Sequence, residues 1–105
     1  MIKRQYTIKL ELGVHARPSS TLAKCMQNFN LEKADMSYVN KEGEIRRGSM
    51  KSIIELLMIC APYLSTVTIE LSGRDEQKAA ECLDKFFSFE DENDLYRAYN
   101  PDLAI

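Results

Sequence analysis

Two short segments in which apolar and polar side chains alternate limit what this chain can fold into. The first is QYTIKLEL at residues 5–12, and the second is TVTIELSG at residues 66–73. Successive side chains of a β-strand point to opposite faces, so this alternation is typical of strands with one buried face. In the second segment, we expect Val67, Ile69 and Leu71 to face inward.

Three other segments predict helices, of which the second is short and apolar throughout, while the first and third have the one apolar face that is typical of an amphipathic helix. The first starts at Pro18, which suits the first helical position because no N–H donor is needed there. The second covers residues 49–59 and is expected to stop before Pro62. The third opens at residues 75–76, whose acidic side chains suit the helix dipole. The apolar residues of the first helix are Leu22, Cys25, Met26 and Phe29. Those of the third helix are Ala79, Cys82, Leu83, Phe86 and Phe87.

The remaining strand signals indicate a hairpin. ADMSYV, at residues 34–39, is followed by the turn sequence NKEGEI and a short strand around Ile45. The complete order is strand, helix, strand, strand, helix, strand, helix. This mixture predicts an α+β fold with one sheet and with helices covering one of its faces.

The character of the chain changes near residue 90. We expect residues 1–90 to form one domain and residues 91–105 to form a C-terminal extension. The extension opens with the acidic run EDEND and carries Tyr96, Tyr99 and Leu103. These three side chains suggest docking on the domain or on another chain, while the alternative is a partly disordered tail.

Charge and hydropathy exclude several classes of function. The 14 basic and 16 acidic residues give a net charge of −2, so the chain has no basic face suited to nucleic acid. No apolar run approaches the roughly 18 residues of a membrane span. The first ten residues, MIKRQYTIKL, lack the apolar core of a signal peptide. We therefore expect no nucleic-acid partner and no membrane insertion.

Cysteine usage points to a reducing compartment. Cys25, Cys60 and Cys82 are odd in number, show no CxxC spacing and fall in apolar segments. We predict three reduced core thiols in a cytoplasmic protein. With one histidine and no cysteine pair, the chain is expected to hold no metal and no cofactor.

The single histidine lies in the stretch GVHARPSS at residues 13–20. Gly13 permits a sharp turn, which places His15 at the start of the first helix. Free backbone N–H groups make a helix N-terminus an anion site, and Arg17 adds a fork of donors suited to phosphate oxygens. The same N-terminus favours a neutral imidazole, which can attack a phosphoryl group. The alternative is a histidine that only caps the helix or faces solvent.

Gly13, His15, Arg17 and Pro18 match the motif Gly-x-His-x-Arg-Pro. In this respect the chain resembles the HPr family, the histidine-containing phosphocarriers of the bacterial phosphoenolpyruvate:sugar phosphotransferase system. The segment Lys51-Ser52-Ile53-Ile54 is similar to the family's regulatory segment. The stretch SGRDEQKAAECL is similar to its last strand-to-helix junction. The resemblance covers residues 1–88.

The resemblance implies both a fold and an activity. The fold would be an open-faced β-sandwich with four antiparallel strands and three helices on one side. Enzyme I would phosphorylate Nδ1 of His15, giving a pros-phosphohistidine, and a sugar-specific A-component would receive the group. Arg17 would help to hold the phosphoryl group. The chain would thus be a phosphoryl carrier rather than a free-standing enzyme.

The second helix carries a further expected modification site. Ser52 and Glu55 have the spacing of a capping box, in which each side chain satisfies a free N–H of the helix start. The resemblance adds HPr kinase/phosphorylase as a partner that phosphorylates Ser52. Glu55 would oppose that phosphate by charge repulsion, although a phosphate suits a helix N-terminus.

The same helix is more apolar than one buried face requires. We expect Ile53, Ile54 and Leu57 to form a docking surface for partners beside His15. The alternative is a short helix that is packed deeply on all sides.

Two segments depart from the family pattern. The stretch between the first helix and Ser52 is longer than usual and predicts an extended hairpin, with Arg46 and Arg47 near its end. The stretch CAPYLS at residues 60–65 lacks the glycines that relatives carry, so we expect Pro62 to build that turn.

Two other functions compete with the carrier. One is a regulatory adaptor that signals through phosphorylation of His15 or Ser52, without sugar transport. The other is a hydrolase that uses Ser19 or Ser20 as a nucleophile. The sequence lacks the GxSxG elbow that would support the hydrolase.

Overall fold

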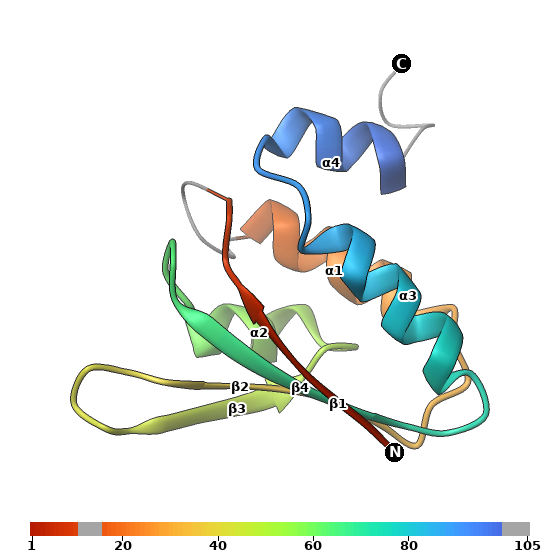
Figure 1. The fold of residues 1–105 in the computed structure, drawn as a ribbon, viewed down its shortest axis with the longest axis horizontal. Coiled ribbons are helices and arrows are strands. Elements are labelled where there is room, and N and C mark those ends of the chain that lie inside the picture. The colour runs from red at the N-terminus through yellow and green to blue at the C-terminus, as the bar shows by residue number, and fades with distance from the viewer. Residues whose placement is uncertain (11–15, 100–105) are drawn as a thin grey trace.

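The computed structural model describes residues 1–10 and 16–99. These residues form four strands and four helices (Figure 1). In chain order they are β1 (Ile2–Thr7), α1 (Ala16–Gln27), β2 (Lys33–Val39), β3 (Ile45–Ser49), α2 (Ile53–Ile59), β4 (Thr66–Ser72), α3 (Glu76–Phe86) and α4 (Glu92–Tyr99).

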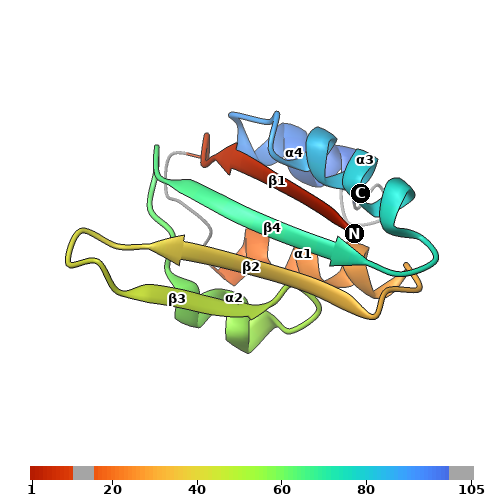
Figure 2. The same ribbon diagram turned by 60° about the horizontal axis from the view of Figure 1, so that its bottom comes forward.

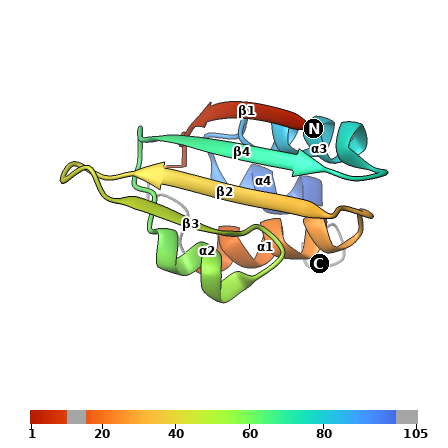
Figure 3. The same ribbon diagram turned by 90° about the horizontal axis from the view of Figure 1, so that it is seen from below.

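The four strands form one antiparallel sheet in the order β1-β4-β2-β3. Tyr6 of β1 lies opposite Val67 of β4, and Met36 of β2 lies between Ile69 of β4 and Gly48 of β3. Figures 2 and 3 show the helices on one face of this sheet and none on the other. The predicted open-faced α+β fold and the hairpin of β2 and β3 are thereby confirmed.

The core lies between the sheet and the helices, where alternate strand residues meet the apolar helix faces. Val67, Ile69 and Leu71 of β4 are fully buried, as their alternation predicts. Each such side chain contributes roughly 1.5–3 kcal/mol relative to an exposed one. The helices bury Leu22 and Met26 of α1, and Ala79, Ala80, Leu83 and Phe86 of α3.

The first strand begins earlier and ends earlier than predicted. Its alternation of exposed and buried side chains continues through Ile8 and Leu10, but the regular ladder with β4 ends at Thr7. Beyond that point the Ile8 N–H donates to the Ser65 carbonyl, and the Leu64 N–H donates to the Ile8 carbonyl. The chain therefore follows a loop after Thr7 rather than a strand.

Two helix boundaries also differ from the prediction. Pro18 is the third residue of α1 rather than the first, and Phe29 lies beyond the end of α1. Helix α2 begins at Ile53 rather than at Ser49, because Ser49 pairs with Asp35 of β2 and belongs to β3.

The three predicted helices are present, and part of the C-terminal extension adds a fourth one that the sequence did not predict. Asp91 starts this helix: its carboxylate accepts hydrogen bonds from the Asn93 and Asp94 N–H groups, and its carbonyl accepts from the Leu95 N–H. Figure 1 shows α4 on the side of α1 and α3 that faces away from the sheet. The acidic run EDEND is thus the capped start of a helix. In the described part of the chain, no helix is long and apolar enough to cross a membrane.

The prediction of three core thiols holds only in part. Cys25 of α1 and Cys82 of α3 are half-buried, whereas Cys60 is exposed. Cys60 follows the last turn of α2, where its side chain points out of the core and donates to the Leu57 carbonyl. A hydrogen bond from the Cys25 thiol lowers the pKa of Cys82 to about 7 and raises the pKa of Cys25.

Candidate functional site

The predicted phosphoryl acceptor, His15, lies outside the described residues, as does Gly13. The described part of the predicted site is the first turn of α1 with Arg17 and Pro18. Pro18 and Ser19 are buried, while Arg17 is exposed. The helix start is therefore packed into the domain, with Arg17 on its exposed side. A buried Ser19 is also unsuited to the role of a hydrolytic nucleophile.

The guanidinium of Arg17 contacts an aromatic ring. Its guanidinium carbon lies 4.0 Å from the centroid of the Tyr96 ring, well inside the roughly 6 Å limit of a cation–π contact. The Tyr96 side chain comes from α4 and is only 6% exposed. The fold thus brings a residue of the C-terminal extension onto the predicted phosphate-binding arginine.

The environment of Tyr96 keeps its phenol protonated. Burial, and then the charge of Glu92, raise the pKa of Tyr96 to about 12, although Arg17 opposes the shift. The Tyr96 hydroxyl donates to Oε2 of Glu92 at 3.3 Å. Sequence reasoning pointed to Tyr96 as a packing residue but missed its partner, because nothing local relates Tyr96 to Arg17.

Ser52 occupies the predicted capping position. It is the N-cap of α2, and its hydroxyl oxygen accepts a hydrogen bond of 3.2 Å from the Glu55 N–H. The second half of the predicted capping box is absent, because Glu55 Oε1 accepts from the Ser49 N–H rather than from Ser52. The Ser52 N–H instead donates to the Ser49 carbonyl within the turn.

Helix α2 divides into a buried and an exposed side. Leu56 and Ile59 are buried, whereas Ile54 and Met58 are 72% and 70% exposed. Of the other predicted docking residues, Ile53 is exposed and Leu57 is half-buried. Met58 was not among the predicted docking residues, although its spacing of four from Ile54 places both on one face.

Helix α2 lies beside α1 (Figure 1), and side-chain hydrogen bonds connect the two segments. The Gln27 side chain of α1 donates to the Lys51 carbonyl, and the Lys51 ammonium donates to the Phe29 carbonyl. On the sheet side, a Cβ at Gly48 would lie 2.8 Å from the Cβ of Glu55, so α2 approaches β3 at a point that only glycine leaves open.

The loop after α2 is built differently from the prediction. Pro62 contributes a carbonyl that accepts from the Ser65 N–H and hydroxyl. Two other residues turn the backbone, because Cys60 and Leu64 adopt left-handed conformations with φ of 52° and 67°. Glycine commonly fills such positions, so this loop stores backbone strain that a glycine would relieve.

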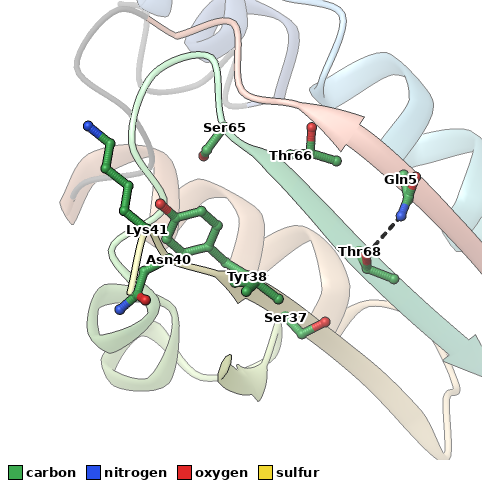
Figure 4. Close-up of a pocket in the computed structure, with 9 residues that line it drawn as sticks. Gln5, Ser37, Tyr38, Asn40, Lys41, Ser65, Thr66 and Thr68 are labelled. Carbon is green, nitrogen blue, oxygen red and sulfur yellow. Dashed lines mark hydrogen bonds between the residues drawn. The ribbon is translucent and has the colours of Figure 1, made fainter. Parts of the chain in front are cut away.

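A shallow pocket lies away from this site, on the sheet and the adjoining turns. Its lining includes Gln5, whose amide donates to the Thr68 hydroxyl, and Tyr38, Asn40 and Lys41 (Figure 4). None of its lining residues comes from α1 or α2. Across residues 1–10 and 16–99, no cluster of histidine, cysteine, aspartate and glutamate could hold a metal ion.

Residues 2–88 match the family model described as the PTS HPr component phosphorylation site. The chain is 39% identical to the phosphocarrier protein HPr of Cupriavidus necator over 83 residues, which cover 79% of this chain and 86% of the relative. It is 31% identical to the HPr-like protein Crh of Halalkalibacterium halodurans, covering 86% of this chain and all of the relative.

Solved structures show the same likeness. A crystal structure of the phosphocarrier protein HPr from Bacillus anthracis superimposes with a TM-score of 0.61 at 26% identity. The match covers 78% of this chain and 90% of that one. The matched family region ends at residue 88, so α4 lies beyond it.

Proposed function

Since this chain belongs to the HPr family of the phosphotransferase system, we propose that it carries a phosphoryl group on His15 from enzyme I to a sugar-specific A-component. The observation that carries this proposal is the family match over residues 2–88, which contains the complete Gly13-x-His15-x-Arg17-Pro18 motif. We place the reaction in the cytoplasm, the reducing compartment that unpaired cysteines favour.

The proposed chemistry needs a nucleophile and a place for negative charge. The lone pair of His15 Nδ1 attacks phosphorus, and the bond from phosphorus to the donor atom of enzyme I breaks as the new N–P bond forms. The transfer to the A-component runs the same exchange with this chain as the donor. Arg17, exposed on the first turn of α1, supplies a guanidinium for the phosphoryl oxygens.

We assign partner docking to the exposed side of α2. Ile53, Ile54 and Met58 expose apolar surface beside α1, and exposed apolar patches of this kind mark interaction sites. Leu57 contributes less than expected, because it is half-buried. Ile54→Glu should leave folding intact and slow phosphorylation by enzyme I. Val39→Glu, which places the same charge on the exposed hairpin, is the matched control.

A second function is favoured by one observation. The relative from Halalkalibacterium halodurans is named an HPr-like protein, Crh, rather than a phosphocarrier. A regulatory adaptor of this kind would be controlled through His15 or through phosphorylation of Ser52 by HPr kinase/phosphorylase. The position of Ser52 as the N-cap of α2 suits a phosphate, but the nearby Glu55 carboxylate opposes it.

Incubation with phosphoenolpyruvate and enzyme I tests the carrier function. We expect intact-mass spectrometry to show one phosphate on the wild-type chain and none on His15→Ala. The phosphorylated chain should then lose its phosphate to an A-component. A chain that accepts phosphate but passes it to no A-component would favour the adaptor.

A further inference from the structure

The helix that lies beyond the family region contacts the arginine of the proposed site. Helix α4 covers Glu92–Tyr99, while the family match ends at residue 88. Tyr96 of this helix nevertheless lies under the Arg17 guanidinium, at 4.0 Å from ring centroid to guanidinium carbon. The extension is therefore part of the surroundings of the site.

Several contacts fix α4 in place, so the Tyr96 ring is held in a defined position beside Arg17. The Leu95 side chain is fully buried. The Tyr99 hydroxyl donates to the Cys82 carbonyl of α3 at 2.6 Å. The Tyr99 ring packs edge-to-face on Phe86 and Phe89, with centroid distances of 5.7 and 6.2 Å. The helix is held at both α1 and α3.

The contact with Tyr96 leaves Arg17 able to bind an anion. The N–H donors of a guanidinium lie in its plane, whereas a cation–π contact uses its face. A carboxylate partner would occupy those donors, but among the ion pairs of residues 1–10 and 16–99 none involves Arg17. An unsupported arginine on an exposed helix turn would instead sample many rotamers.

We propose that Tyr96 is a positioning residue, which holds the Arg17 guanidinium at the start of α1 ready for phosphoryl oxygens. This inference rests on the proposed carrier function. It makes the C-terminal extension a working part of the phosphoryl site rather than an appendage. The hydroxyl of Tyr96 is not required for this role, because the ring face makes the contact.

The test compares full-length variants in the transfer of phosphate from enzyme I. Tyr96→Leu should lower kcat/KM about threefold to tenfold, the range expected for loss of a cation–π contact. Tyr96→Phe should retain the wild-type value, because it keeps the ring. Tyr38→Leu makes the same change on β2, away from α4, and serves as the matched control.

A double-mutant cycle separates positioning from a merely structural role. If Tyr96 acts through Arg17, then Tyr96→Leu should have no further effect in an Arg17→Ala background. Tyr96→Met, whose longer unbranched side chain adapts better to the space left by the ring, takes the place of Tyr96→Leu if the latter does not fold.

Three results would overturn the inference: faster transfer in Tyr96→Leu, an unchanged rate, or an equal loss with and without Arg17. Faster transfer would mean that α4 withholds Arg17 from the phosphate. A wild-type chain that accepts no phosphate from enzyme I would contradict the carrier function itself, which distinguishes the two failures.

Discussion

The hydroxyl of Tyr99 donates a hydrogen bond of 2.6 Å to the backbone carbonyl of Cys82. This bond joins the last turn of α4 to the middle of α3, and the Tyr99 ring covers Phe86 beside it. The C-terminal extension is thereby attached to the body of the domain. The stability of the whole chain should consequently depend on a residue outside the family region.

Tyr99→Phe should lower the free energy of unfolding by about 1 kcal/mol, the usual net contribution of one hydrogen bond. The ring packing is kept, so only the bond to Cys82 is lost. Urea unfolding measures the change. Tyr63→Phe removes a hydroxyl from a ring that is 48% exposed and should leave stability unchanged. Equal stability of Tyr99→Phe and wild type would contradict the attachment of α4.

Alkaline pH should weaken the fold through its tyrosines. Burial raises the pKa of Tyr6, Tyr96 and Tyr99 above the ordinary value, to about 12 for Tyr96. A raised folded-state pKa gives stability that is complete below the unfolded pKa of about 10 and is lost as pH rises through the folded value. Denaturant unfolding should therefore show stability falling between about pH 10 and 12, together with late tyrosinate absorbance. Absorbance that rises fully near pH 10 would contradict the burial of these rings.

Ser52→Ala should cost about 1 kcal/mol of stability, because the Glu55 N–H loses its cap. Ser52→Asp should keep most of it, since a carboxylate at an N-cap still accepts this hydrogen bond. Thermal unfolding of the two variants measures the difference. If both substitutions cost the same, the side-chain oxygen is not the capping group.

Cys60→Gly should stabilise the chain by up to about 1 kcal/mol, because a non-glycine residue in the left-handed region is strained. The side chain is exposed, so little packing is lost. The opposite change, Gly43→Ala at φ of 82°, should destabilise the hairpin turn by a similar amount. Melting temperatures that move together in the two variants would refute this account of the backbone.

The sheet could be predicted because its signal is local. Val67, Ile69 and Leu71 alternate within one strand, and their burial follows from that pattern alone. The start of α2 was misplaced for the opposite reason: Ser49 is a strand residue because Asp35 pairs with it, which the local pattern does not reveal. Glu55 likewise bonds to the Ser49 N–H only because the chain turns tightly before Ser52.

The residues of the candidate site likewise differ in whether a local sequence pattern predicts them. Arg17 and Ser52 could be selected from short motifs, each of which carries its own chemistry. Tyr96 could not be assigned to Arg17, because the two residues meet only after α4 has docked on α1. Tyr96 and Tyr99 suggested that the extension docks on the domain or on another chain, but not that it forms a helix or which residue it would cover.

The most direct test of the carrier account locates the phosphate on one atom. The uniformly ¹⁵N-labelled chain is phosphorylated by enzyme I and phosphoenolpyruvate, and NMR then follows the imidazole nitrogens of His15. If the chain is a phosphocarrier of this kind, phosphorus is bonded to Nδ1, seen as a one-bond ³¹P–¹⁵N coupling at that nitrogen. A phosphate on any other residue, or on Nε2 of His15, would contradict it.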